Sequence, residues 1–103
     1  AHAGAIDGVV IKLMKTGGLR EMRRMIHAAR AHGLQVMIGS MIETSLALTA
    51  AAQLAPLVDF LDLDGHWLLA DDPFDGAPRE RGVLTLSERP GLGVVWRRGA
   101  PAA

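Results

Sequence analysis

The chain has no cysteine among its 103 residues, so neither a disulfide framework nor a thiolate metal site is available to it. Its eleven basic and eleven acidic side chains leave a formal net charge of zero, which gives no reason to expect nucleic acid or an anionic membrane as a partner. The longest nearly uncharged stretch, residues 44–58, falls short of the roughly 18 apolar residues of a membrane span. No signal peptide is recognisable at the start. These absences predict a soluble cytoplasmic protein.

Lysine is scarce as well. Against nine arginines stand only two lysines, Lys12 and Lys15, both in one short segment. An arginine keeps its proton at any working pH, whereas a partly buried lysine can serve as a base. Lysine chemistry is therefore confined to this segment, although a coding bias toward arginine explains the scarcity equally well.

Apolar and β-branched runs alternate with amphipathic stretches along the first two thirds of the chain. Each strand-like run ends in glycine or a polar residue, and each helix-like stretch repeats its apolar residues every three or four positions. The order is a strand over 8–13, a helix over 19–32, a strand over 34–38, a helix from Thr44 or Ser45 to Pro56, and a strand over 57–63. Strands that alternate with crossover helices in this way predict a parallel sheet.

After Gly65 the pattern gives way to turn-rich sequence, and only residues 83–86 look like a further short strand. The chain is long enough for one domain, and no low-complexity linker divides it. We expect residues 1–98 to form one α/β unit with about three parallel strands, two helices and an irregular C-terminal segment. Residues 99–103 are expected to be a disordered tail.

Polar side chains stand at the ends of all three predicted strands. Lys12 closes the first strand, Ser40 follows the second, and Asp62 and Asp64 close the third. Parallel strands deliver their carboxyl ends to one edge, where ligands bind in open sheets and in barrels. Asp62 and Asp64 share one face of the strand because side chains alternate with a period of two. A lysine, a hydroxyl and two carboxylates are therefore expected at one mouth.

Each of these residues also has a purely structural interpretation. Lys12 is equally well explained as a cation that extends to water from a strand end, and Ser40 as a turn residue. The two aspartates are suited to capping backbone amides or to holding a divalent cation. Glu43 precedes the second helix and favours the positive end of its dipole. Neither His66 nor the Gly17-Gly18 pair receives a chemical role, since no phosphate-loop spacing accompanies the glycines.

Three motifs at consecutive strand ends carry a resemblance to a known family. They are Ile-Lys-Leu-Met-Lys-Thr-Gly-Gly at 11–18, Met-Ile-Gly-Ser-Met-Ile-Glu-Thr at 37–44, and Asp-Leu-Asp-Gly at 62–65. Together with Asp-Pro-Phe at 72–74 and Pro-Gly-Leu-Gly at 90–93, they resemble the dipeptide epimerases in the muconate-lactonizing branch of the enolase superfamily. The resemblance covers most of residues 7–95. It implies that the chain is the C-terminal part of a (β/α)8 TIM-type barrel domain.

The resemblance also implies a role for each site residue. Lys12 matches one of two acid/base lysines, whereas Lys15 matches a neighbour without a catalytic role. Asp62 and Asp64 match the pair that holds the α-ammonium group of a small dipeptide substrate. The residues Ser40, Met41 and Ile42 match the segment that lines the substrate pocket. The implied reaction is a 1,1-proton transfer at the α-carbon of the C-terminal residue, between lysines on opposite faces, with Mg²⁺ stabilising the enediolate.

The family's metal-binding carboxylates and its second lysine have no counterpart in these 103 residues. A complete barrel needs eight strands and about 250 residues, so we expect an inactive fragment whose Mg²⁺ ligands lie upstream. The full-length enzyme is compatible with a homo-oligomer. Two alternatives stay open at this point. One is a muconate cycloisomerase or o-succinylbenzoate synthase-like enzyme, in which the Asp-x-Asp pair is not expected. The other is a noncatalytic α/β module.

Overall fold

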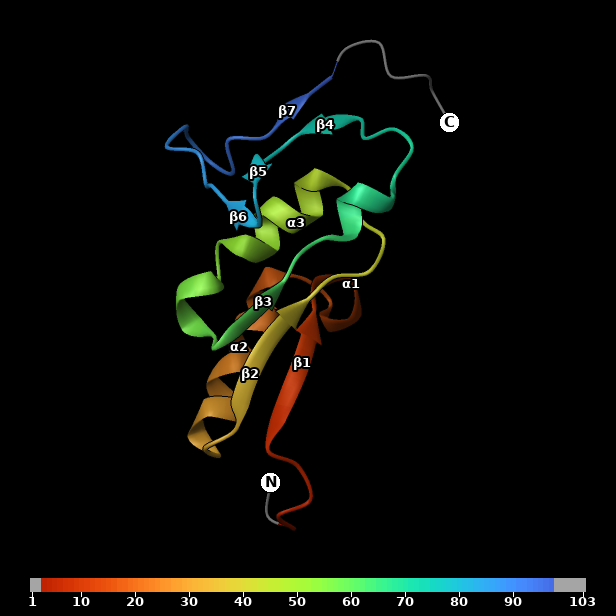
Figure 1. Ribbon diagram of the computed structural model, residues 1–103. Coiled ribbons are helices and arrows are strands. Elements are labelled where there is room, and N and C mark those ends of the chain that lie inside the picture. The colour runs from red at the N-terminus through yellow and green to blue at the C-terminus, as the bar shows by residue number, and fades with distance from the viewer. Residues whose placement is uncertain (1–2, 98–103) are drawn as a thin grey trace.

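A three-stranded parallel sheet forms the centre of the computed structural model, which describes residues 3–97 (Figure 1). The strands lie in the order β1-β2-β3 and comprise Gly8–Lys12, Gln35–Gly39 and Phe60–Asp62. The register pairs Val9 with Val36 and Ile38 with Leu61. The α/β class and the parallel sheet expected from the sequence are confirmed.

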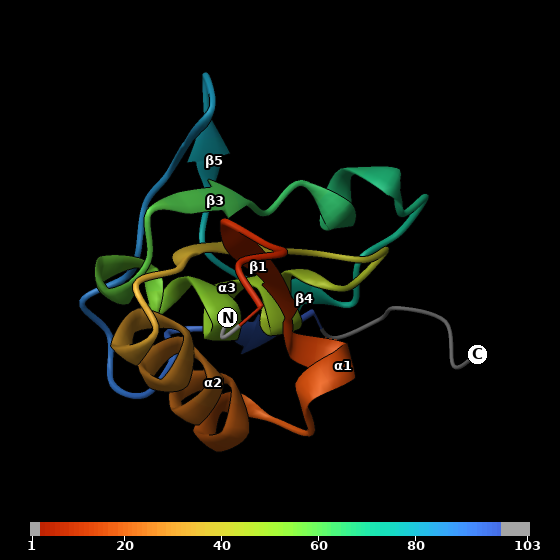
Figure 2. The same ribbon diagram turned by 90° about the horizontal axis from the view of Figure 1, so that it is seen from below.

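Helix α2 (Leu19–Ala31) follows β1 and covers one face of the sheet. Met22, Ile26 and Ala29 recur along a single stripe of this helix and are buried, while most of its arginines face outward. The helix ends where Gly33 adopts a left-handed conformation with a φ of 71°. Figure 2 shows α2 and α3 lying to the same side of the strands.

Helix α3 (Ser45–Ala52) connects β2 to β3 and completes the hydrophobic core. Its residues Leu48, Ala51 and Ala52 pack with α2 and with alternate side chains of the strands. The strand residues in this core are Ile11, Val36 and Ile38, and Leu63, directly after β3, joins them. The opposite face of the sheet is bare: Val10 is 59% exposed and Phe60 52% exposed. The helices therefore cover one face of the sheet, and the other face exposes apolar and polar side chains.

Several boundaries differ from the sequence-based expectation. Strand β1 ends at Lys12, because Leu13 already begins the short helix α1 (Leu13–Thr16), which the sequence did not reveal. Helix α3 ends at Ala52, before the expected stop at Pro56. The proline instead lies in a 3-10 turn, η1 (Ala55–Leu57), so β3 is shorter than expected. A second 3-10 turn, η2 (Gly65–Leu68), follows β3.

The cap of α3 also differs from the expectation. Neither the Thr44 nor the Ser45 hydroxyl caps the helix; Asp72 Oδ2 accepts a hydrogen bond from the Ser45 amide at 2.7 Å. The other oxygen of Asp72 accepts one from the Phe74 amide at 3.0 Å. Asp72 therefore takes the place at the helix dipole that the sequence assigned to Glu43, and it fastens the C-terminal segment to α3.

The C-terminal segment forms two small antiparallel pairs beyond the carboxyl ends of the sheet strands (Figure 1). Strand β4 (Phe74–Asp75) pairs with β7 (Val95–Trp96), and β5 (Arg79–Glu80) pairs with β6 (Val83–Leu84). Only β6 was expected, and it is shorter than predicted. The predicted tail at 99–103 lies outside the described residues. No helix within residues 3–97 has the length and apolarity needed to cross a membrane.

Candidate functional site at the carboxyl ends of the strands

The last residues of the three strands form one row across the sheet. Lys12 is in register with Gly39, and Gly39 is in register with Asp62. Residues in register on parallel strands project to the same face, so Lys12 and Asp62 flank a glycine that has no side chain. With strands about 4.8 Å apart, the Cα atoms of Lys12 and Asp62 lie about 10 Å from each other. The row lies on the face that the helices leave open.

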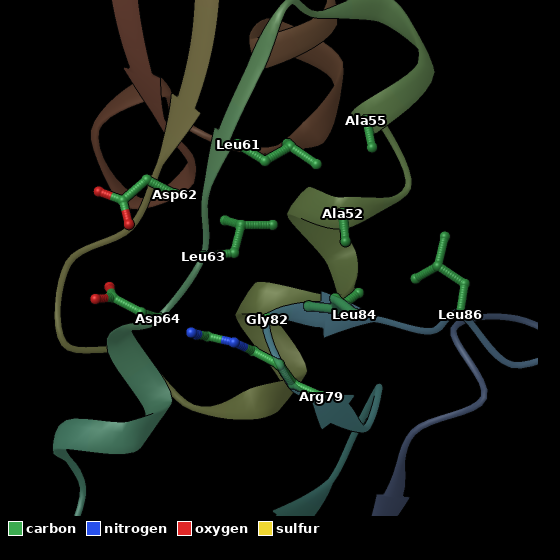
Figure 3. A pocket seen from close by; sticks show the side chains of 10 residues that line it. All are labelled: Ala52, Ala55, Leu61, Asp62, Leu63, Asp64, Arg79, Gly82, Leu84 and Leu86. Carbon is green, nitrogen blue, oxygen red and sulfur yellow. The ribbon is translucent and has the colours of Figure 1, made fainter.

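Asp64 joins this row from the turn that follows β3. Figure 3 shows Asp62 and Asp64 pointing to one side of the chain and Leu61 and Leu63 to the other. Both carboxylates belong to exposed residues, whereas Leu63 is buried against the helices. The structure thus brings the two aspartates together on one face, as the alternation of side chains predicts.

Ser40 lies at the same edge, but its hydroxyl is occupied by backbone groups. The Ser40 Oγ atom donates to the carbonyl of Asp62 at 3.3 Å and accepts from the Gly65 amide at 3.1 Å. The Ser40 amide donates to the same Asp62 carbonyl at 3.0 Å. The serine therefore joins the exit of β2 to the turn between β3 and η2, which agrees with the structural interpretation of this residue.

Met41 and Ile42 continue from Ser40 over the open end of the sheet. The Lys12 Nζ atom donates a hydrogen bond to Met41 Sδ at 3.4 Å. Met41 is 39% exposed and Ile42 is 60% exposed, so both side chains are available at the mouth. The structure therefore brings Lys12, Met41 and the aspartate pair to one edge.

Arg79 is a residue of this edge that sequence reasoning missed. It belongs to β5 and stacks on Trp67, with its guanidinium carbon 3.5 Å from the centre of the ring. In Figure 3 its side chain extends toward Asp64. It lies 15 positions after Asp64 in irregular sequence, where no periodicity signals it. Stacking of this kind fixes the position of the cation without a carboxylate partner.

A cavity of about 290 Å³ lies beside β3, on the side facing the helices. Apolar residues such as Ala52, Leu63 and Leu84 line it, and so do the charged residues Asp62, Asp64 and Arg79. The side chains of Asp62 and Asp64 point away from the apolar residues (Figure 3). The cavity therefore borders on the row of polar side chains, and the two carboxylates point from it to the open face of the edge.

Two other polar side chains near the edge are at least partly buried. The Nδ1 atom of His66 is buried and has no hydrogen-bond partner within residues 3–97. Glu43 is buried to 8% exposure. Within the described part of the chain, no three His, Asp or Glu side chains are grouped so as to hold a metal ion. Asp62 and Asp64 alone do not make a magnesium site, so the residues present do not fit this ion.

Comparison with known proteins agrees with the geometry. Residues 1–100 match the family model described as enolase C-terminal domain-like. The chain is 49% identical over 95 residues to an L-Ala-D/L-Glu epimerase of Bacteroides thetaiotaomicron. The matched segment covers 92% of this chain and 25% of that relative. It is 52% identical over 97 residues to a hydrophobic dipeptide epimerase of Flavobacteria bacterium strain MS024-2A, and this match covers 94% of this chain and 28% of that relative.

A solved structure shares the fold. The dipeptide epimerase of Methylococcus capsulatus, complexed with a Mg ion, superposes with a TM-score of 0.85 at 41% sequence identity. The match covers 93% of this chain and 29% of that one. The chain thus spans about a quarter of the length of the curated relatives it matches.

Proposed function

The chain belongs to the enolase C-terminal domain-like family, and from this premise we propose that it supplies part of the active site of a dipeptide epimerase. The observation that carries the proposal is the row formed by Lys12, Gly39 and Asp62, with Asp64 on the same face. It combines a potential acid/base group with a receptor for a cation. The named epimerases among the relatives support the same reaction class.

In this proposal Asp62 and Asp64 bind the α-ammonium group of the dipeptide. Charge-assisted hydrogen bonds between an ammonium and carboxylates are the stronger kind. Both carboxylates belong to exposed residues on the open face of the sheet, so a ligand can reach them. The two aspartates carry the negative charge that such a group needs.

Lys12 then exchanges a proton with the α-carbon of the C-terminal residue on one face. Consecutive Cα atoms are 3.8 Å apart, so the ammonium nitrogen of a dipeptide lies about 5 Å from the second α-carbon. The proton-transfer group and the ammonium receptor must therefore both lie within reach of a short ligand, and Lys12 and the aspartates share one edge of the sheet. Gly39 has no side chain, and the aliphatic stem of Lys12 lies over it, so the amine extends along the row.

Magnesium belongs to the complete protein in this proposal, because residues 3–97 do not hold a metal-binding group of three side chains. A bound metal ion would supply electrostatic stabilisation of the developing enediolate. The residues present here are limited to holding the ammonium and moving one proton. The second acid/base group is likewise expected from residues outside this chain.

The test of the ammonium receptor uses the complete protein that contains this chain. Asp62→Asn should raise the KM for a dipeptide with a free amine by about 10- to 100-fold, since one charge-assisted bond is worth about 1.5–3 kcal/mol. The same change should hardly affect an N-acetylated analogue, which has no ammonium group. Asp71→Asn, at an exposed position outside the edge, is the matched control. Equal losses with both substrates would remove the receptor role and favour a cycloisomerase or succinylbenzoate synthase-like reaction.

The role of Lys12 is tested by exchange of the α-proton with D2O. Lys12→Ala should abolish the exchange that proceeds from one face and so affect one diastereomer of a dipeptide. Lys15→Ala, three positions away on α1, serves as the control and should leave both diastereomers unaffected. Retained exchange of both diastereomers in Lys12→Ala would refute the assignment.

A further inference from the structure

The Lys12 amine has a sulfur atom as its hydrogen-bond partner. Lys12 Nζ lies 3.4 Å from Met41 Sδ. Within residues 3–97 no carboxylate lies within ion-pairing distance of this amine, although Asp62 stands in the same row. The structure thus holds the lysine beside a neutral acceptor and apart from the acidic pair.

Gly39 gives the lysine its path to this sulfur. A Cβ atom built on Gly39 would lie 3.4 Å from Lys12 Cε and 3.8 Å from Lys12 Cγ. The aliphatic stem of Lys12 therefore lies across the bare backbone of Gly39. From there the amine reaches Met41, two residues beyond Gly39 on the chain that leaves β2.

The backbone of Met41 is itself fixed by the turn after β3. A Cβ atom on Gly65 would overlap the Met41 carbonyl oxygen and would lie 3.0 Å from Ser40 Oγ. The Gly65 amide also donates to Ser40 Oγ at 3.1 Å. Close packing against Met41 and the hydrogen bond to the neighbouring Ser40 leave the Met41 backbone little freedom, so its side chain starts from a fixed point beside the amine.

A thioether is suited to this position by its chemistry. It is a weak, polarizable acceptor that carries no charge. A carboxylate in the same place would favour the ammonium form strongly through its charge. A sulfur atom orients an amine without placing a negative charge beside it, which suits a group that both accepts and returns a proton.

We propose that Met41 is a positioning residue that holds the Lys12 amine at its face of the substrate. This inference rests on the proposed epimerase function and adds to it a role that differs from lining the substrate pocket. A wall residue would affect the binding of every substrate isomer. A residue that positions Lys12 affects only the proton transfer that Lys12 carries out.

The first experiment compares α-proton exchange in D2O for both diastereomers of L-Ala-Glu in the complete protein. Met41→Leu keeps the size and apolar character of the side chain and removes the sulfur. We expect it to lower exchange about 10- to 100-fold for the diastereomer that Lys12→Ala identifies as its own. Exchange of the other should stay within about twofold. Met14→Leu, an exposed methionine on α1, is the matched control and should change neither.

Equal losses for the two diastereomers in Met41→Leu, or no loss for either, would overturn the proposal. If the unmodified protein exchanges neither diastereomer, the epimerase function itself fails, and a second measurement then decides on the contact. In that measurement, acetic anhydride labels the lysines and mass spectrometry compares Lys12 with Lys15. The ratio of labelling should rise about twofold or more in Met41→Leu, because a weak hydrogen bond no longer holds Lys12. An unchanged ratio would contradict the positioning role.

Discussion

Replacement of Gly65 by alanine should disrupt the edge of the sheet more than replacement of any glycine that faces a flexible side chain. The added Cβ would overlap the Met41 carbonyl oxygen and approach the carbonyl carbon to 3.0 Å. Both obstacles are backbone atoms, and they can move only if the chain segment that follows β2 moves with them. Relief of the overlap requires a displacement of about 1 Å or more.

The expected magnitude follows from two effects. Overpacking that shifts backbone costs about 1–3 kcal/mol. The same displacement stretches the hydrogen bond between the Gly65 amide and Ser40 Oγ, worth about 0.5–1.5 kcal/mol. The free energy of unfolding should fall by about 2–4 kcal/mol. With a urea dependence of about 2 kcal/mol per molar, the midpoint should fall by about 1–2 M.

The matched comparison is Gly39→Ala. There the added Cβ meets the side chains of Val10 at 3.2 Å and Lys12 at 3.4 Å, and both can rotate aside. We expect a loss of stability below about 1 kcal/mol, together with a displaced Lys12. Urea unfolding followed by circular dichroism measures both variants. A midpoint for Gly65→Ala equal to or above that of Gly39→Ala would refute the reasoning that Gly65 locks the Met41 backbone.

Two further predictions concern carboxylates that hold the fold together. The hydrogen bond from the Val36 amide lowers the pKa of Asp59, and the Arg30 guanidinium lowers it further. Asp59 should therefore stabilise the fold at pH values above the ordinary carboxyl pKa. This contribution should be lost as the pH falls through the lowered pKa. Urea unfolding between pH 7 and pH 3 should show a smaller acid-induced loss in Asp59→Asn than in the unmodified protein, and parallel curves would contradict this. Asp72→Ala removes the acceptor of the Ser45 amide and should cost about 1–2 kcal/mol in thermal unfolding, whereas a comparable loss in Asp71→Ala would argue against a cap-specific effect.

Much of the fold could be predicted from local patterns. The β-branched run before Lys12 and the apolar stripe of residues 19–31 depend on neighbours in the sequence, so periodicity reveals them. The boundaries depended on more distant contacts. Helix α3 begins where a carboxylate 27 residues away caps it, and the short pairs β4–β7 and β5–β6 have no alternation long enough to detect.

The sequence by itself determined that Lys12, Ser40, Asp62 and Asp64 lie at one edge, because parallel strands end together and side chains alternate. It also carried the resemblance to the dipeptide epimerases, in motifs that need no coordinates. Only the tertiary structure decided which of these groups touch. Gly65 has no side chain where it packs against Met41, so its amide reaches the Ser40 hydroxyl, which also donates to the Asp62 carbonyl. Gly39 has no side chain where the stem of Lys12 crosses it, so the Lys12 amine reaches the Met41 sulfur. Contacts of this kind join residues 22 to 29 positions apart, and no local pattern encodes such distances.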